Sequence, residues 1–492
     1  SFLNSLMVFS SYLFVFYFLP FSLLLYYATP WRPVRHFGLT VSSFIFYAWG
    51  SPKFLFLLIG TTFLDYFLGR VQAHNGFRNW RQPIEALPIG GPRSRVQKSA
   101  FLTALIVDLG LLGFFKYFNF AADNYQSFVS AIGLSQLQFE SVMRVTLPIG
   151  ISFYVFQEVS YAVDVYRGQT RAMRSLNDYF CFVAQYQQMV AGPIVRYAEL
   201  ADQMEARTHT VDKFARGVAL FSLGMAMKVL LANPCGKVAD TVFNAGPVGP
   251  LEAWVGTLAY AFQILFDFAG YSEMAIGLGL LMGFVFAKNF AAPYQAESIT
   301  EFWRRWHISL STLLRDYVYI PLGGNRKGES RTYFNLLLTM LIGGLWHGAS
   351  WNFVIWGGIH GAWLAFERTF GKRSFYRNWP KWTRVGLTFL IVLLSWVFFR
   401  TADLPSALGH LGAMFGLTAR QSGADLVAGV IYQPYYVVSL MAAGVVAFGF
   451  PTVWAWTQNL TAPKASICLA ALWVSLVVLI TQAYNPFIYF IF

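Results

Sequence analysis

Runs of hydrophobic residues alternate with short polar, mostly basic loops along almost the whole chain. Many runs approach the ~20 residues that a helix needs to cross a bilayer, and about ten to twelve spanning segments are expected. The pattern predicts an all-α, polytopic membrane bundle with additional re-entrant and interfacial helices. The predicted apolar runs are 8–28, 37–49, 54–69, 101–115, 145–165, 217–231, 251–268, 271–286, 334–346, 351–366, 385–399, 435–450 and 466–480.

Two interruptions modify this pattern. Gly50-Ser51-Pro52 separates two short runs, so one of these runs is expected to be re-entrant or strongly tilted. The stretch 176–197 is apolar but contains Gln185, Gln187, Gln188 and Gly192-Pro193. Because irregular backbone at membrane depth must be packed within protein, this stretch is predicted to be a broken, protein-buried helix.

Composition supports a lipid environment. Hydrophobic residues make up 56% of the 492 residues and charged residues only 12%, whereas soluble proteins carry about 25% charged residues. The three cysteines, Cys181, Cys235 and Cys468, are scattered and show no metal-ligand spacing. No metal site is therefore expected from them.

The charged residues are distributed asymmetrically. Lys and Arg number 36 against 23 Asp and Glu, and most of the basic residues fall in six loop clusters, at 32–35, 70–98, 167–174, 196–216, 304–331 and 368–384. Such a bias is typical of cytoplasmic loops in membrane proteins. Nucleic-acid binding is not expected, since apolar spans separate the clusters and the chain has no basic tail.

The segment 301–319 has helical periodicity of a different kind. Its apolar residues fall on one stripe, and a second face carries Arg304, His307, Ser311 and Arg315. This pattern predicts an amphipathic helix at the membrane interface. One interpretation is a membrane-surface helix in which the histidine is incidental. The other is a cavity rim whose arginines bind a phosphate-bearing molecule.

A second histidine, His347, lies in the glycine-rich segment 343–351 within an apolar run. An ionisable residue at bilayer depth indicates a functional site. A continuous helix would place Ser350 and Trp351 on the same face as His347 and would turn His360 away. A neutral imidazole can act as a general base. The alternative is a structural histidine bonded to a backbone carbonyl.

The chain resembles the membrane-bound O-acyltransferase (MBOAT) superfamily, and within it the bacterial alginate O-acetylation branch. The motifs that carry the resemblance are 46–49 (FYAW), 191–197 (AGPIVRY), 266–275 (FDFAGYSEMA), 301–324 and 343–361. The resemblance implies one membrane domain over residues 7–492 with a central tunnel, after a short added remnant at 1–6. Within that domain, 301–331 would be the cytoplasmic-side helix and turn, and 332–366 the region of the catalytic histidine.

The resemblance also implies an activity and its residues. His347 would be catalytic, with His307 as its companion that holds or polarises the donor. Residues expected near the donor are Arg304, Arg305, Ser311, Arg315, Trp346 and Ser350. The donor would be a cytoplasmic acyl thioester such as acetyl-CoA or an acyl carrier protein, with no bound cofactor and no metal.

The implied acceptor is a hydroxyl outside the bacterial inner membrane, on a polysaccharide or on a periplasmic SGNH-type acetyltransferase partner. D-alanyl transfer to teichoic acid is the alternative within the family. Outside the family, a proton-coupled transporter would use the intramembrane histidine as a relay, but the spans hold few carboxylates and no internal repeat is visible. A glycosyltransferase is disfavoured because no Asp-x-Asp pair occurs.

Overall fold

The computed structural model describes residues 7–78, 80, 82–139, 141–371, 374–419, 424–482 and 484–488. The predicted remnant at 1–6 and the basic residues Arg81, Lys372 and Arg373 lie outside the described residues. The described residues contain helices and loops and no β-strand, which confirms the all-α prediction. The chain forms two compact units, Ser1–Thr210 with Met282–Phe286, and Val211–Leu281 with Ala287–Phe492.

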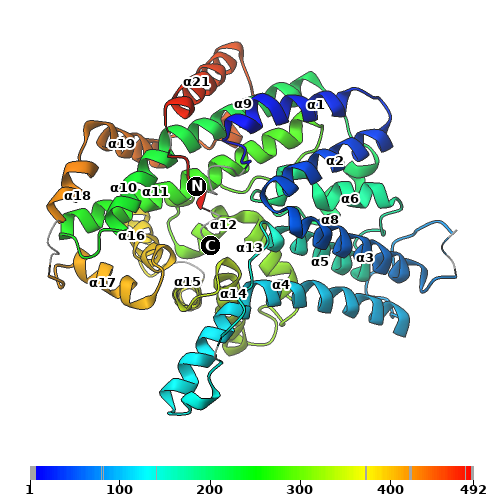
Figure 1. Cartoon of the computed structure of the whole chain (residues 1–492), viewed down its shortest axis with the longest axis horizontal. Coiled ribbons are helices and arrows are strands. Elements are labelled where there is room, and N and C mark those ends of the chain that lie inside the picture. Colours follow the sequence, from blue (N-terminus) through cyan, green and yellow to red (C-terminus); the bar gives the residue numbers. More distant parts are fainter. Residues whose placement is uncertain are drawn as a thin grey trace. The chain divides into compact units, whose positions relative to one another are not determined.

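The first unit is built around three mutually packed helices, α3, α4 and α5, which lie beside one another in Figure 1. Gly69 permits the closest approach in this group, because a Cβ there would lie 2.2 Å from the Tyr161 hydroxyl. Ser94 and Gln97 form a capping box that starts α4. The helices of this unit are α1 (Leu19–Tyr27), α2 (Arg32–Gly50), α3 (Leu55–His74), α4 (Arg95–Ala131), α5 (Ile151–Arg167), α6 (Leu176–Ala184), α7 (Tyr186–Met189) and α8 (Tyr197–Glu205), with a π-helical turn at Phe14–Phe18 and 3₁₀ turns at Pro52–Phe54 and Ser135–Leu137.

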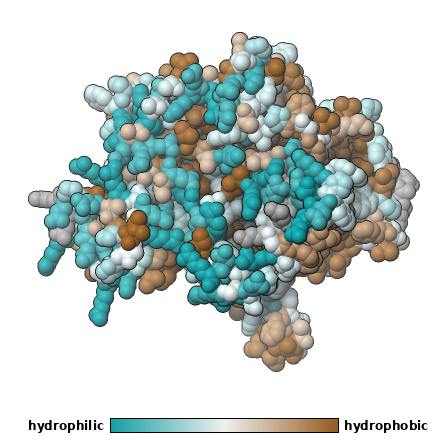
Figure 2. Space-filling model, turned by 180° about the vertical axis from the view of Figure 1, so that it is seen from behind, coloured by the Kyte–Doolittle hydropathy of each residue, from teal (hydrophilic) through white to brown (hydrophobic). Residues whose placement is uncertain are grey.

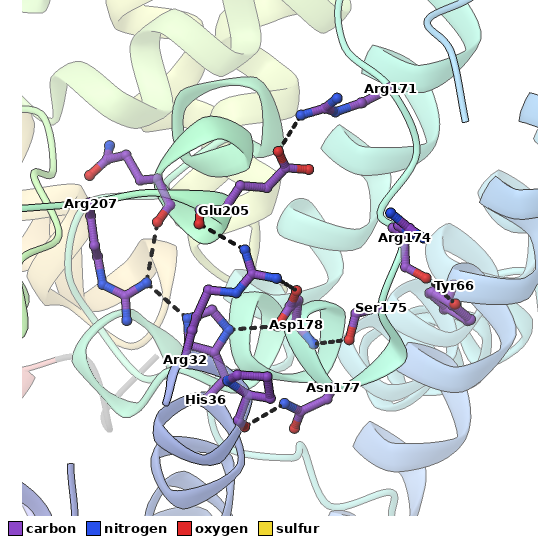
Figure 3. Close-up of polar contacts among 12 residues, drawn as sticks. Arg32, His36, Tyr66, Arg171, Arg174, Ser175, Asn177, Asp178, Glu205 and Arg207 are labelled. Carbon is purple, nitrogen blue, oxygen red and sulfur yellow. Dashed lines mark hydrogen bonds and ion pairs between the residues drawn. The ribbon is translucent and has the colours of Figure 1, made fainter. Parts of the chain in front are cut away.

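A polar network at the start of α2 uses several basic residues of the predicted loop clusters (Figure 3). Arg207 donates to Nε2 of the buried His36 at 2.8 Å, so Nδ1 of His36 carries the proton and donates to Asp178 at 2.6 Å. Arg32 contacts the same carboxylate at 3.5 Å and donates to the Glu205 carbonyl oxygen at 2.7 Å. These arginines therefore stabilise the local structure, in addition to the effect that basic loops have on the orientation of a protein in the membrane.

The second unit centres on α11 (Pro250–Leu281), which packs against α9 (Val211–Ala226) and α10 (Asn233–Phe243). Two glycine pairs let α9 and α11 approach closely: Cβ atoms on Gly270 and Gly277 would lie 2.7 and 2.6 Å from the carbonyl oxygens of Gly224 and Gly217. The remaining helices are α12 (Ile299–Arg305), α13 (Ile308–Leu314), α14 (Glu329–His347), α15 (Trp351–Thr369), α16 (Lys381–Arg400), α17 (Leu404–Met414), α18 (Ala424–Ile431), α19 (Pro434–Gly449), α20 (Val453–Trp456) and α21 (Ala462–Thr481), with π-helical turns at Met227–Ala232 and Arg315–Tyr319 and a 3₁₀ turn at Pro293–Gln295.

One prediction about the membrane spans of this unit is wrong. The runs 251–268 and 271–286, expected to be two spans, form the single helix α11 up to Leu281. The intervening Ala269-Gly270 does not break the helix, because Gly270 is the residue that allows the close contact with α9. The predicted broken helix at 176–197 is confirmed, since α6 ends at Ala184 and α7 begins at Tyr186.

Six helical segments of the described chain are long and apolar enough to span a membrane, and Phe14–Tyr27 and Pro434–Gly449 are shorter apolar helices. Large apolar side chains are widely exposed, among them Phe56, Ile106, Leu426 and Trp473, and the face shown in Figure 2 combines patches of hydrophobic residues with a large hydrophilic area. The six segments are Pro52–His74, Arg95–Ala131, Val211–Phe243, Pro250–Leu281, Lys381–Arg400 and Ala462–Thr481.

Candidate active site

His307 lies at a break between two short helices of the second unit. The segment 301–319, expected to be one amphipathic helix, ends its first helix at Arg305 and begins the next at Ile308. His307 itself has a positive φ of 43°, a conformation rare for non-glycine residues. The backbone bonds Ala291 N–Arg305 O and Ile308 N–Asn289 O, both 2.9 Å, replace the helical ones. The prediction of a single continuous face was therefore wrong.

This break buries the His307 ring completely. Nδ1 lies 3.3 Å from the Asn289 side-chain oxygen, which also accepts from the Ser309 amide at 3.2 Å and hydroxyl at 2.9 Å. The amide donor fixes the orientation of Asn289, so Nδ1 of His307 carries the proton and Nε2 is the acceptor nitrogen. Burial lowers the pKa of His307 to about 3, and the ring is neutral at physiological pH.

His347 is the last residue of α14, and α15 begins after a three-residue turn. The expected continuous helix through this segment is therefore wrong. Ser350 does not face His347 along one helix. It caps α15 by accepting from the Asn352 amide at 3.1 Å, and Trp351 is 58% exposed. Gly344 and Gly357 let α14 and α15 approach closely, because Cβ atoms there would lie 2.2 Å from the Phe353 carbonyl oxygen and 2.4 Å from that of Met340.

The tertiary structure brings the two predicted histidines together. Their ring centroids lie 6.4 Å apart, and the Trp346 ring lies 5.9 Å from His307 and 5.0 Å from His347. A narrow cavity of about 10 Å³ adjoins His347 and is otherwise lined by apolar side chains. Its lining residues are Ile264, Phe268, Trp306, His347, Trp396, Phe399 and Ile488.

A larger cavity of about 620 Å³ lies along α12, α13 and the facing parts of α14 and α15. Arg304, Ser311 and Arg315 line it, whereas His307, which the cavity-rim interpretation placed on the same face, does not, and Arg368 adds a third guanidinium. Arg304 forms no ion pair or hydrogen bond with any described side chain, whereas Arg315 pairs with Asp316 at 2.7 Å. The cavity is therefore basic and suits an anionic molecule.

Arg305 does not line this cavity. It pairs with Glu301 one turn earlier on α12 and approaches the carbonyl oxygens of Ala291 and Ala292 at 3.5 and 3.4 Å. Arg305 therefore contacts its own helix and the neighbouring loop. These contacts help to stabilise the backbone hydrogen bonds between residues 289–291 and the helix break at His307.

Sequence reasoning missed the residues that position this site from α15. Glu367 is buried and accepts from the Ile299 and Thr300 amides, each at 2.8 Å, so it caps α12 from a distant helix. His360, expected to face elsewhere, accepts from Trp303 Nε1 at 3.2 Å and contacts the Ser395 hydroxyl at 3.1 Å. Both ring nitrogens of His360 thus have protein partners, so this histidine has a structural role.

The C-terminal segment 484–488 was also missed, although it forms part of the cavity wall at Ile488. The Ile488 amide donates to Asp267 at 2.8 Å, and Asp267 pairs with the buried Lys228 at 2.9 Å. Lys228 also donates to the Pro486 carbonyl oxygen. Asp267 lies in the 266–275 motif, but its partners are 39 and 221 residues away in sequence.

Asp267→Ala is expected to destabilise the protein by about 3–5 kcal/mol, because it leaves the Lys228 charge buried without its counter-ion. Thermal unfolding of the purified protein, followed by intrinsic fluorescence, measures the loss. Limited proteolysis should cut the C-terminal segment sooner. The double variant Lys228→Met/Asp267→Leu is the control: it removes both charges and should be more stable than Asp267→Ala. A single variant as stable as wild type would contradict the role of the pair.

Comparison with known proteins identifies the family of this chain. The model of the MBOAT, membrane-bound O-acyltransferase family, matches residues 94–402, which include both histidines. The chain belongs to this family. Membership makes it an acyltransferase with a multi-pass membrane fold.

Several members of the family are close relatives. A protein of Pseudomonas syringae named "Probable alginate O-acetylase" is 48% identical over 83% of this chain and 75% of its own length. A protein of the same description from Azotobacter vinelandii is 42% identical over 99% of this chain and all of its own length. A peptidoglycan O-acetyltransferase of Helicobacter pylori is 36% identical over 84% and 80%.

Proposed function

We propose that this membrane acyltransferase moves an acetyl group from a cytoplasmic thioester donor to a hydroxyl on the far side of the bacterial inner membrane. The hydroxyl would belong to a polysaccharide or to a periplasmic SGNH-type acetyltransferase that passes the group onward. The juxtaposition of His307 and His347, 6.4 Å between centroids, carries the proposal, and the basic cavity begins at Ile308, the residue after His307.

His347 is assigned the role of general base. Its imidazole accepts the proton of the acceptor hydroxyl as the oxygen attacks the thioester carbon. The C–S bond then breaks, and the leaving thiolate takes the proton back from the imidazolium, so that the histidine ends neutral. Trp346, Trp356 and Phe399 pack around the ring, with centroids 5.0 to 5.2 Å away, and exclude water that would otherwise hydrolyse the donor.

His307 is assigned to donor handling. A neutral ring with its proton on Nδ1 presents Nε2 as an acceptor, so it does not polarise a carbonyl oxygen by donating to it. It suits instead an N–H group, such as an amide of a pantetheine arm. Because the ring is fully buried, side chains packed against it, such as Phe268 and Trp346, must move before the donor arm reaches it.

The basic cavity is assigned to the anionic part of the donor. Its volume of about 620 Å³ falls in the range of small-molecule sites. Arg304, Arg315 and Arg368 supply planar guanidinium groups that bind phosphate in a bidentate manner. Both acetyl-CoA and a phosphopantetheinylated carrier protein bring phosphate to this position. The family resemblance names them as donors, and the arginines support either.

The names of the relatives favour acetyl over D-alanyl transfer. The Pseudomonas and Azotobacter relatives and the Helicobacter relative all carry O-acetylation in their names. Their named substrates, alginate and peptidoglycan, are both cell-envelope or secreted polysaccharides. We therefore propose a polysaccharide as the final acceptor of this chain as well.

The test uses the full chain in proteoliposomes with a defined donor on one side. Radiolabelled acetyl-CoA is supplied outside or inside the vesicle, and an SGNH-type partner or oligosaccharide acceptor is supplied on the other side. Labelled acceptor should form only when donor and acceptor face opposite sides. Transfer from a D-alanyl carrier protein with none from acetyl-CoA would favour the alternative. Proton flux without any acyl donor would favour a transporter.

The donor route predicts a topology. The loops at 70–98, 326–331 and 368–384 should all be cytoplasmic, because they concentrate arginine and lysine. Single cysteines placed in each loop should resist labelling by a membrane-impermeant maleimide in intact cells and react after lysis. The three native cysteines are buried and give a low background. Strong labelling of any of these loops from outside would reverse the orientation and the side of donor entry.

A further inference from the structure

Each of three adjacent helices of the first unit contributes one acidic residue to its interior. Asp65 lies on α3, Asp108 on α4 and Glu158 on α5, and each is at most 1% exposed. Two of these helices belong to candidate membrane spans. Carboxyl groups in such a setting are costly and indicate a function. None of the three belongs to the acyl-transfer site of the second unit.

The three carboxyl groups converge. One oxygen from each lies within 4.8 Å of the others, and the Asp65 and Asp108 carboxyls are within hydrogen-bonding reach. Both oxygens of Asp65, both of Asp108 and Oε2 of Glu158 lack a hydrogen-bond donor. Only Oε1 of Glu158 has protein donors, the hydroxyls of Thr61 at 3.1 Å and Thr62 at 2.9 Å.

No basic side chain compensates this charge in the part of the chain that the structure describes. None of the ion pairs there includes Asp65, Asp108 or Glu158. Lys116, on the same helix as Asp108, donates instead to the Ser152 hydroxyl at 3.3 Å. Three buried carboxylates without a counter-charge would cost far more than a folded protein can offset. Positive charge must therefore neutralise them, either as a bound cation or as protons on the carboxyls.

Two tyrosines add an independent indication of a ligand. Tyr154 and Tyr179 have fully buried side chains whose hydroxyls have no partner among the described residues. Tyr154 lies on α5 four residues before Glu158, and Tyr179 lies on α6, which packs against α3 and α5. Phenolic oxygens so placed extend the set of oxygen atoms around the carboxyls beyond the acids themselves.

We propose that Asp65, Asp108 and Glu158 bind a divalent cation of the calcium type, with the Tyr154 and Tyr179 hydroxyls completing its surroundings. Ca²⁺ binds six to eight oxygens at about 2.3–2.6 Å, so opposite ligands lie ~4.6–5.2 Å apart. Three carboxyl oxygens that all lie within 4.8 Å of one another can be accommodated on this sphere. Mg²⁺ gives up its waters reluctantly and is seldom held by protein ligands alone, so a fully buried site favours Ca²⁺. The bound ion links α3, α4 and α5.

Metal content and thermal unfolding of the full chain in detergent test the site. Protein purified without chelator should contain about one equivalent of calcium by elemental mass spectrometry. After stripping with EGTA, added Ca²⁺ should raise the unfolding temperature by at least about 3 °C, since a ligand specific for the native state stabilises it. Mg²⁺ at the same concentration should have a smaller effect.

Asp108→Asn keeps the shape of the side chain and removes one charge, and it should lose both the calcium and the thermal shift. The matched control is Asp123→Asn on the same helix, because Asp123 is exposed and paired with Arg144. It should retain both. Wild-type protein without metal that shows no Ca²⁺-dependent shift would overturn the proposal and leave protons as the neutralising charge. Equal calcium in Asp108→Asn would overturn it too. If Asp108→Asn does not fold, the calcium content and thermal shift of the wild-type protein alone decide the question.

Discussion

His347→Ala is expected to lower acyl transfer by roughly 10²–10⁴-fold, the effect of removing a positioned acid–base group. The imidazole ends α14 beside a cavity that otherwise has apolar walls, so no other side chain lining that cavity can take the acceptor proton. Transfer of labelled acetyl groups in proteoliposomes measures the loss, and thermal unfolding of the same preparation shows that the variant is folded.

His410→Gln is the matched control for this experiment. His410 is a buried histidine of the same unit that contacts the Thr257 hydroxyl at 3.0 Å, and it lines neither cavity. It should retain activity within about threefold of wild type, apart from any loss of stability. Folded His347→Ala protein with comparable activity would rule out His347 as the base.

Donor binding should depend on His307 and Arg304 and be nearly independent of His347. A charge-assisted hydrogen bond to phosphate contributes about 1.5–3 kcal/mol. Arg304 is exposed and screened by solvent, so the lower end applies, about tenfold in the dissociation constant. Arg315→Ala should have a smaller effect, because Asp316 already pairs with that guanidinium. Calorimetric titration of each purified variant with the donor measures these differences.

The control is Arg331→Ala, another arginine of the second unit that packs over Phe334 and does not line the basic cavity. It should bind donor like wild type, and raising the salt concentration should weaken wild-type binding more than that of Arg304→Ala. If His307→Ala binds donor normally and His347→Ala does not, the two histidines have exchanged roles and the proposed mechanism is wrong.

Much of the membrane architecture follows from local sequence. Long apolar runs specify helices because backbone groups in lipid must bond within their own segment. The breaks at Gly50-Ser51-Pro52 and near Gln185 were recognised from residues that disfavour a continuous apolar helix. The two histidines were also recognised from local context, since ionisable groups in apolar surroundings are rare.

Local sequence failed where a distant segment determined the backbone. The helical period continues through 301–319, yet the helix breaks at His307, since residues 289 and 291 supply hydrogen bonds that replace the helical ones. The expectation for Ser350 failed as well. Its spacing from His347 would place both residues on one face only if the helix were continuous, and Ser350 instead precedes the start of α15. At Gly270 the reverse error occurred: the sequence suggested a break, but the helix α11 continues through this residue, which packs closely against α9.

Hydrophobic periodicity, basic loops and two unusual histidines were thus readable from the chain alone, because each depends on neighbouring residues and on the solvent that surrounds a segment. The meeting of His307 with His347, the capping of α12 by Glu367, the C-terminal wall at Ile488 and the convergence of Asp65, Asp108 and Glu158 were not. Each joins residues from separate elements, and helix packing determines which elements meet. The periodicity of a segment shows which face is buried but not which segment packs against it.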